Sequence, residues 1–267
     1  MSGVLLRVVV AAAFLFLLLP MAVVVVTSFS SSPGLVFPPE GLTTYWYRNI
    51  SSEFLKALGV SLLVALGTTT IATLVGTPAA LALVRGKFRG RQLIAALCLS
   101  PLMVSTLVIG VAAYQYVVVL WDWFGLSLAG SLIGLVLGQT AFTIPFVVRS
   151  AITGQSHLDE SLEEASLSLG AAPLETFFRV TLPIIRPGIV SGAVFAFIMS
   201  FDDVPIALFL GGGGATTLPV KIYTSVEFSI SAEVMAVGTI VIGASLLIML
   251  VLARTVGLHL MFGTKKL

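Results

Sequence analysis

The sequence predicts an all-α polytopic membrane protein with six transmembrane helices, and three observations support this fold class. Hydrophobic residues make up 58% of the 267-residue chain and charged residues only 10%, with a mean hydropathy of +1.11. This composition leaves too little polar surface for a soluble protein. Apolar segments of about 20 residues, the length that crosses the hydrocarbon core, recur along the chain. One polar stretch, residues 158–188, separates them and contains five of the twelve acidic residues.

The apolar segments divide the chain into a first helix, a core and a tail. Residues 1–56 should form the first transmembrane helix and an external loop, residues 57–257 a five-helix core with the polar loop 150–188, and residues 258–267 a tail. We expect the first helix to be retained, because its apolar run is longer than that of a cleaved signal peptide. The six expected spans are residues 5–26, 57–84, 92–118, 129–148, 189–210 and 234–256.

Basic residues indicate the orientation of these spans. With both termini in the cytoplasm, eleven Lys and Arg residues lie on the inner side and three outside, which is the bias that inner loops show. The run from Arg85 to Arg91 supplies four of the eleven. Residues 27–53 and 120–128 then form external loops, in which Trp46 and Trp121 suit the membrane interface. The polar stretch faces the cytosol.

The first half of the polar stretch predicts a short helix. Ser161 and Glu164 have the spacing of a capping box, in which a hydroxyl and a carboxylate satisfy free amides at a helix start. The helix then runs to Leu169. Gly170 can adopt the left-handed conformation that ends a helix.

The second half predicts another short helix after a turn. Pro173 fits its first position, since the missing amide of proline is not needed there. Residues 174–180 continue it, and we expect Pro183 and Pro187 to stop it.

The order of residues in this stretch resembles the cytoplasmic loop of binding-protein-dependent ABC importer permeases. That loop has the signature Glu-Ala-Ala, three residues, Gly, nine residues, then Ile-x-Leu-Pro. The matching residues here run from Glu164 to Ser166, then Gly170, then from Val180 to Pro183, with every interval kept. Only Ser166 for Ala and Val180 for Ile depart from the signature.

The resemblance implies a type I ABC importer permease fold, in which the first short helix inserts into a cytosolic ATPase. The implied partners are a homologous second permease, an ABC ATPase dimer, an external substrate-binding protein and membrane lipid. The implied location is the bacterial inner membrane, with both termini cytoplasmic. ATP and Mg would be bound by the ATPase, with no cofactor in this chain. The implied coupling residues are Glu160, Glu163, Glu164, Ala165, Ser166, Gly170, Ala171, Leu182 and Pro183.

Shorter motifs resemble the second permease subunit of spermidine and putrescine importers, which implies transport of a polyamine by alternating access. Another small amine-containing solute, such as an amino-acid-like amine, an opine or an aminophosphonate, is the alternative in the same class. A secondary transporter is less favoured, because no internal repeat is evident. The motifs are residues 27–29, 88–90, 145–148, 200–203 and 218–223.

Asp202 and Asp203 are the candidate substrate-pathway residues, together with the polar Gln139 and Tyr114. Each aspartate costs a few kcal/mol within a membrane span, and no basic residue of the chain shares their depth. Adjacent helical residues point about 100° apart, so one should face the pathway and the other a neighbouring helix. The alternative is that the helix ends early and leaves the pair hydrated or paired with the companion subunit.

The sequence lacks the residues that several kinds of chemistry would need. No phosphate-binding Gly-Lys-Ser/Thr loop occurs, so we expect a non-enzymatic subunit without catalytic residues. His157 and His259 lack ligands at metal-binding spacing, which predicts no metal site. Cys98 is the only cysteine and cannot form an intrachain disulfide. A net charge of +2 gives no reason to expect a nucleic-acid partner.

Overall fold

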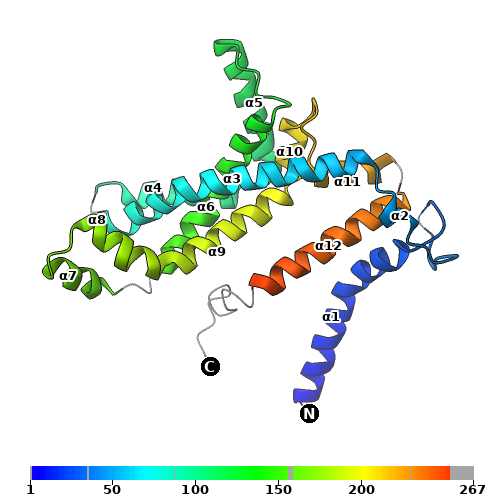
Figure 1. Cartoon of the computed structure of the whole chain (residues 1–267), viewed down its shortest axis with the longest axis horizontal. Coiled ribbons are helices and arrows are strands. Elements are labelled where there is room, and N and C mark those ends of the chain that lie inside the picture. Colours follow the sequence, from blue (N-terminus) through cyan, green and yellow to red (C-terminus); the bar gives the residue numbers. More distant parts are fainter. Residues whose placement is uncertain (1, 35, 87, 156–158, 229, 253–267) are drawn as a thin grey trace. The chain divides into compact units, whose positions relative to one another are not determined.

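The computed structural model describes residues 2–34, 36–86, 88–155, 159–228 and 230–252, and their regular elements are helices (Figure 1). The predicted all-helical, polytopic fold class is confirmed. Five helical stretches within these ranges are long and apolar enough to cross a membrane, and two shorter apolar ones accompany them. The five are α1 (Ser2–Thr27), α3 (Ser52–Arg85), α5 (Thr106–Phe124), α6 (Leu132–Gln155) and the stretch Pro173–Phe201.

Some predicted features lie outside the described residues. These are the tail 258–267, the end of the sixth span, and both histidines, His157 and His259.

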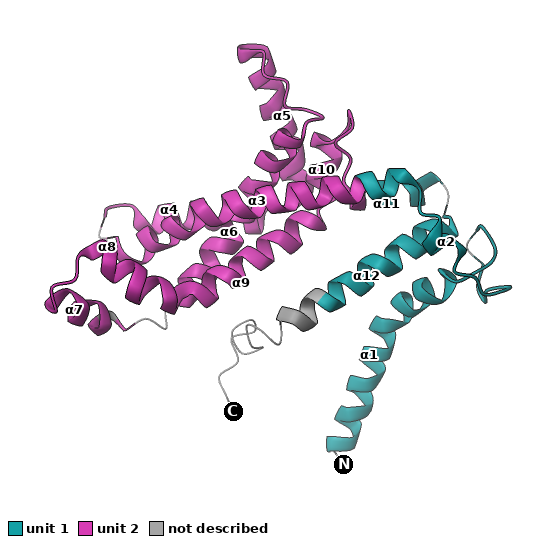
Figure 2. Cartoon of the chain, in the orientation of Figure 1, with its two compact units in different colours: residues 1–56, 221–251 teal, residues 57–220, 252–267 magenta. Residues whose placement is uncertain are grey.

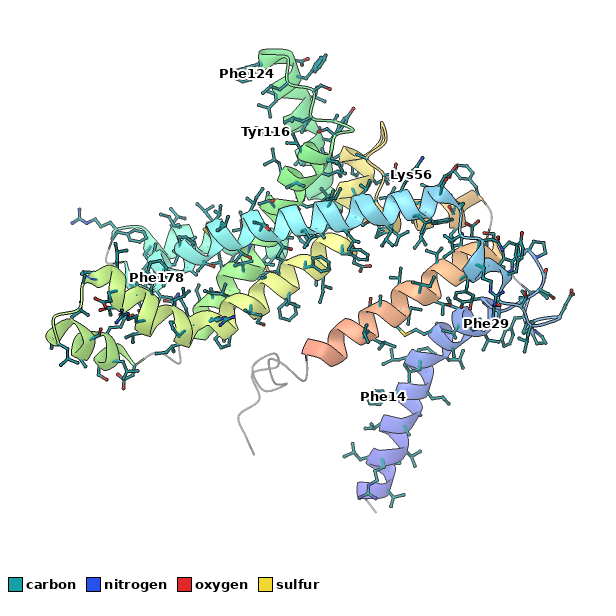
Figure 3. All side chains as sticks on the ribbon, viewed as in Figure 1. Phe14, Phe29, Lys56, Tyr116, Phe124 and Phe178 are labelled. Carbon is teal, nitrogen blue, oxygen red and sulfur yellow. The ribbon has the colours of Figure 1, made fainter. Side chains whose placement is uncertain are left out.

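The chain forms two compact units, residues 1–56 with 221–251 and residues 57–220 with 252–267 (Figure 2). The first unit contains α1, the short α2 (Tyr45–Arg48) and α12 (Ala232–Leu252). Side chains project from α1 on all sides, with Phe14 among them (Figure 3), and the spanning window of α1 buries none of its residues within the protein. Lipid or another protein must therefore cover it.

Hydrogen bonds hold the loop after α1 in the first unit. The indole nitrogen of Trp46 donates to the carbonyl of Ser30 at 3.0 Å, and the amide of Ser51 donates to the Glu233 carboxylate at 2.8 Å. These bonds connect the loop to itself and to the start of α12.

The second unit contains the polar stretch and the helices around it. Its central contact is between α6 and α9 (Leu182–Phe201), which lie side by side (Figure 1). The other elements of this unit, besides α3, α5 and α6, are α4 (Arg91–Leu99), η1 (Ser100–Met103), α7 (Glu160–Ser168), α8 (Pro173–Thr176), η2 (Phe177–Thr181), α9 (Leu182–Phe201) and α10 (Pro205–Leu210), and the helix α11 (Leu218–Phe228) begins here.

Glycines bring the α6 and α9 backbones close together. A Cβ atom added at Gly188 would lie 2.7 Å from the Cα of Gly154, and one at Gly192 would lie 2.9 Å from the Cα of Val147. Small residues at helix contacts in membranes allow such approach, and van der Waals packing between the backbones then stabilises the pair.

The predicted third span, residues 92–118, is wrong as a single helix. α4 ends at Leu99 and the 3-10 turn η1 follows, with Pro101 in its first turn. Val104 is extended, with φ −100° and ψ 139°, and α5 begins only at Thr106. Pro101 lacks the amide that would continue the α-helical ladder, so the chain tightens and then restarts.

α5 also extends beyond the predicted end of that span. The expected external loop, residues 120–128, is helical as far as Phe124, and Gly125 ends the helix in the left-handed conformation with φ +67°. Residues 111–124 contain no proline or glycine, so the helix continues through the two tryptophans to Gly125.

The predicted fifth span, residues 189–210, is wrong at both ends. Its helix begins before Ile189 and stops at Phe201, and α10 is a separate helix that begins at Pro205. Residues 211–233, between the expected fifth and sixth spans, contain all of α11.

The glycine contact predicts a specific loss of stability. Gly188→Ala places a methyl group against the α6 backbone, so we expect it to cost about 1–3 kcal/mol, as overpacking does. Thermal unfolding in detergent should show a lower midpoint. Gly59→Ala is the matched control, because no atom lies within 4 Å of its added Cβ. Equal midpoints for the two variants would contradict the close contact.

Candidate functional site

α7 carries the first half of the polar stretch, and its start differs from the prediction. Asp159 is the N-cap residue, and its carboxylate accepts the Ser161 amide at 3.0 Å. Hydrogen bonds from the backbone and side chain of Ser161 lower the pKa of Asp159. The predicted capping box of Ser161 and Glu164 is wrong, because the helix begins two residues earlier, at a residue that caps equally well.

The end of α7 confirms the prediction for Gly170. This residue has φ +88°, and the following amide, that of Ala171, donates to the carbonyl of Ser166 at 3.2 Å. No atom lies within 4 Å of the position that a Cβ would take. Backbone conformation alone, and not space, therefore favours glycine here.

The second helix does not stop as predicted. Pro173 opens α8 in the expected position, but the chain passes through the π-helical turn η2 directly into α9. The Leu182 amide donates to the carbonyl of Phe177, five residues back. Pro183 lies in the first turn of α9, directly after the π-helical turn, and Pro187 lies inside the helix.

Polar contacts join α7 to the helices behind it. The Arg85 guanidinium donates to Glu163 Oε1 at 2.5 Å, and the Thr181 hydroxyl donates to the same oxygen. The hydroxyls of Ser166 and Thr176 are hydrogen-bonded at 3.0 Å. A small cleft of about 150 Å³ lies among these residues, so α7 rests on polar contacts more than on a packed core.

The predicted coupling residues separate into two groups. Glu163 and Ser166 are half-buried and contact other parts of this chain. Ala171 and Leu182 are also half-buried. The exposed members are Glu164, Ala165, Gly170 and Pro183. Glu160 begins α7.

Apolar side chains accompany the exposed group. Leu169, Leu174 and Phe178 are all largely exposed, and Figure 3 labels Phe178 on the turn that follows α8. Exposed apolar residues next to a charged helix face are typical of a protein-binding surface.

The two aspartates occupy different environments at the end of α9. Asp202 is the C-cap residue and its side chain is exposed, whereas Asp203 is only 6% exposed. The Asp203 carboxylate accepts the Ala207 amide at 2.9 Å and the Gln139 side-chain amide at 3.3 Å. It therefore satisfies a free amide in the first turn of α10, where Pro205 has none to offer.

A buried network fixes Asp203 to α6. Gln139 is fully buried, and its carbonyl oxygen accepts the hydroxyl of Ser200, itself 3% exposed. The structure thus brings Gln139 to Asp203. Tyr114 lies half-exposed on α5, and no hydrogen bond joins it to the other three predicted pathway residues.

Sequence reasoning missed Arg85, Thr181 and Ser200. Ser200 precedes Asp203 by three residues, a helical spacing that could have suggested a shared partner. Arg85 lies 78 residues from Glu163, and no local pattern connects the two.

Comparison with known proteins identifies the class. Residues 72–258 match the family described as "Binding-protein-dependent transport system inner membrane component", and the chain belongs to this family. It is a membrane-spanning permease subunit of an ABC importer, as the loop signature predicted.

More specific similarities lie within this class. The chain is 37% identical over 234 residues to the putrescine transport system permease protein PotI of Escherichia coli K12, covering 86% of this chain and 83% of PotI. It is 32% identical over 242 residues to the spermidine/putrescine transport system permease protein PotC of the same strain, covering 90% and 89%.

A solved structure shares the fold. A chain of a bacterial ABC transporter involved in the import of the acidic polysaccharide alginate aligns with a TM-score of 0.72 at 19% identity. The alignment covers 95% of this chain and 96% of that chain.

The buried network predicts that the two aspartates differ in their effect on stability. Asp203→Ala removes the acceptor of two buried donors, which costs about 1–3 kcal/mol per unsatisfied group. We expect a lower yield of folded protein and a lower unfolding midpoint in detergent. Asp203→Asn retains one acceptor oxygen and should lose less. Asp202→Ala is the matched control, and a loss as large as that of Asp203→Ala would contradict the assignment.

Proposed function

We propose that this chain forms part of the translocation pathway of a polyamine importer in the bacterial inner membrane. The observation that carries the proposal is the similarity, over more than four fifths of each chain, to permeases named for putrescine and spermidine transport. In the proposed assembly it pairs with a second permease, an ABC ATPase dimer that binds ATP and Mg, and an external binding protein. Both termini face the cytoplasm, in agreement with the distribution of Lys and Arg.

The proposed coupling element is α7. Its exposed Glu164 and Ala165 provide the contact with the ATPase, next to the exposed apolar Leu169. The helical path from Pro173 to Phe201 has no break, so a displacement of α7 and α8 can pass along α9. This supports a movement that passes from α7 along α9 to Asp202 and Asp203.

The proposed pathway residue is Asp202. Its carboxylate is exposed, whereas that of Asp203 is occupied by two donors. An exposed carboxylate in a largely apolar surrounding attracts a cationic solute, because low-dielectric walls strengthen the field of a charge.

Uptake in a reconstituted complex tests the substrate. Proteoliposomes with the cognate ATPase and binding protein should accumulate labelled putrescine or spermidine in an ATP-dependent manner. Asp202→Asn should reduce uptake at low substrate concentration by about tenfold, within the range of electrostatic steering, while the stability of the complex is kept.

Other outcomes separate the alternatives. Uptake of an opine, an aminophosphonate or an amino-acid-like amine in place of a polyamine would keep the class and reject the substrate. Uptake without ATP or binding protein would indicate a secondary transporter.

The left-handed turn after α7 predicts a loss of coupling. Gly170→Val should reduce substrate-stimulated ATP hydrolysis at least about fivefold, the lower end of typical coupling factors, because a β-branched residue is strained at φ +88°. Gly170→Asn is the matched control, since Asn tolerates this conformation. Normal stimulation in the Val variant would argue against a role for the turn in aiming α7.

A further inference from the structure

We infer that Arg85 and Glu163 form a positioning pair that fixes α7 to the end of α3, so that the ATPase stroke is delivered to two transmembrane helices. This inference rests on the proposed coupling role of α7. It assigns Glu163 to the inside of the permease and gives a function to Arg85, which lies outside the loop signature.

The geometry distinguishes Glu163 from its neighbour. The Glu163 side chain is 19% exposed, and its Oε1 accepts hydrogen bonds from both Arg85 and Thr181. Glu164, in contrast, is exposed. Consecutive helical residues point about 100° apart. Glu164 therefore lies on the exposed face of α7, whereas Glu163 turns toward the permease.

The three groups come from three different elements. Arg85 is the last residue of α3, Glu163 lies in the middle of α7, and Thr181 is the last residue of η2 and is buried. One carboxylate oxygen thus connects the end of α3, the coupling helix and the start of α9.

A cleft surrounds the ion pair, which makes this contact important for the position of α7. The cleft of about 150 Å³ is lined by Arg85, Glu163 and Thr181 together with apolar side chains of α7, α8 and η2. Because α7 does not pack tightly against α3 there, the ion pair is the contact that fixes α7 to α3. The other ion pair of the loop, Arg179 with Glu175, is more exposed and joins residues of one helical stretch only.

The contact with Glu163 also connects α3 to the movement of α7. Without the pair, displacement of α7 could pass only through α8 and η2 into α9. With it, the same displacement pulls on α3, which packs with α5, α6 and α10 through a core that includes Val64, Leu135 and Ile206. α3 and α9 then both move as ATP is hydrolysed.

A charge-reversal cycle tests the inference. In the reconstituted complex with ATPase and binding protein, Glu163→Arg and Arg85→Glu should each reduce the ratio of stimulated to basal ATP hydrolysis by about tenfold, within the usual range of coupling. The double variant should recover to within about threefold of wild type, since the reversed pair restores the contact and a hydroxyl can also accept from Arg. Arg91→Glu is the matched control, because it is exposed and forms no ion pair within the described ranges.

Co-purification of the ATPase completes the test. We expect the ATPase to remain bound in all these variants at equal yield of assembled complex. If a single variant assembles poorly, the reversed pair must restore the yield. A double variant as uncoupled as the singles, or loss of ATPase binding in the isosteric Glu163→Gln, would overturn the inference. A wild-type complex without ATPase binding or stimulated hydrolysis would instead overturn the proposed function.

Discussion

Where α9 ends and α10 begins, free backbone amides need hydrogen-bond partners. The rest of the second unit depends on this constraint. In a membrane each unpaired amide costs several kcal/mol, so a chain break at membrane depth needs polar partners from the protein itself. Asp203 supplies one to Ala207, and Gln139 holds the same carboxylate from α6. The interruption at residues 202–204 is therefore stabilised by a hydrogen bond from α6, which lies alongside α9.

The contact between α6 and α9 is maintained at both ends by different means. Near the polar loop, Gly154 and Gly188 allow the backbones to touch. At the other end, Gln139 is bonded to Ser200 and Asp203. One end is fixed by shape and the other by directional hydrogen bonds, so α9 cannot rotate about its axis without displacing α6. A stroke that enters α9 is then shared by the pair.

Local rules predict the parts of the fold that depend on neighbouring residues, such as the left-handed Gly170 and the helix start at Pro173. They fail where competing signals are equally good, as for Asp159 and Ser161, both strong caps. They also fail for proline, which ends α4 before Pro101 but is accommodated at Pro183 by a π-helical turn. The bonds of Gln139 with Asp203 and of Arg85 with Glu163 span 64 and 78 residues. No local period encodes such pairs, so only the fold reveals them.

The difference between Asp202 and Asp203 follows from the same constraint on the backbone. The continuous stretch of 29 residues before them is about 40 Å long at the rise of an α-helix, and its irregular points are η2 and Pro187. Because Asp203 is tied to α6, a displacement that arrives along α9 cannot be absorbed by moving Asp203 alone. The short segment between the Asp202 amide, the last donor into α9, and the Val204 carbonyl, the first acceptor in α10, is the deformable part. In the proposed cycle, Asp202 therefore changes its exposure while its neighbour remains fixed, which couples movement of the loop to access of a cation.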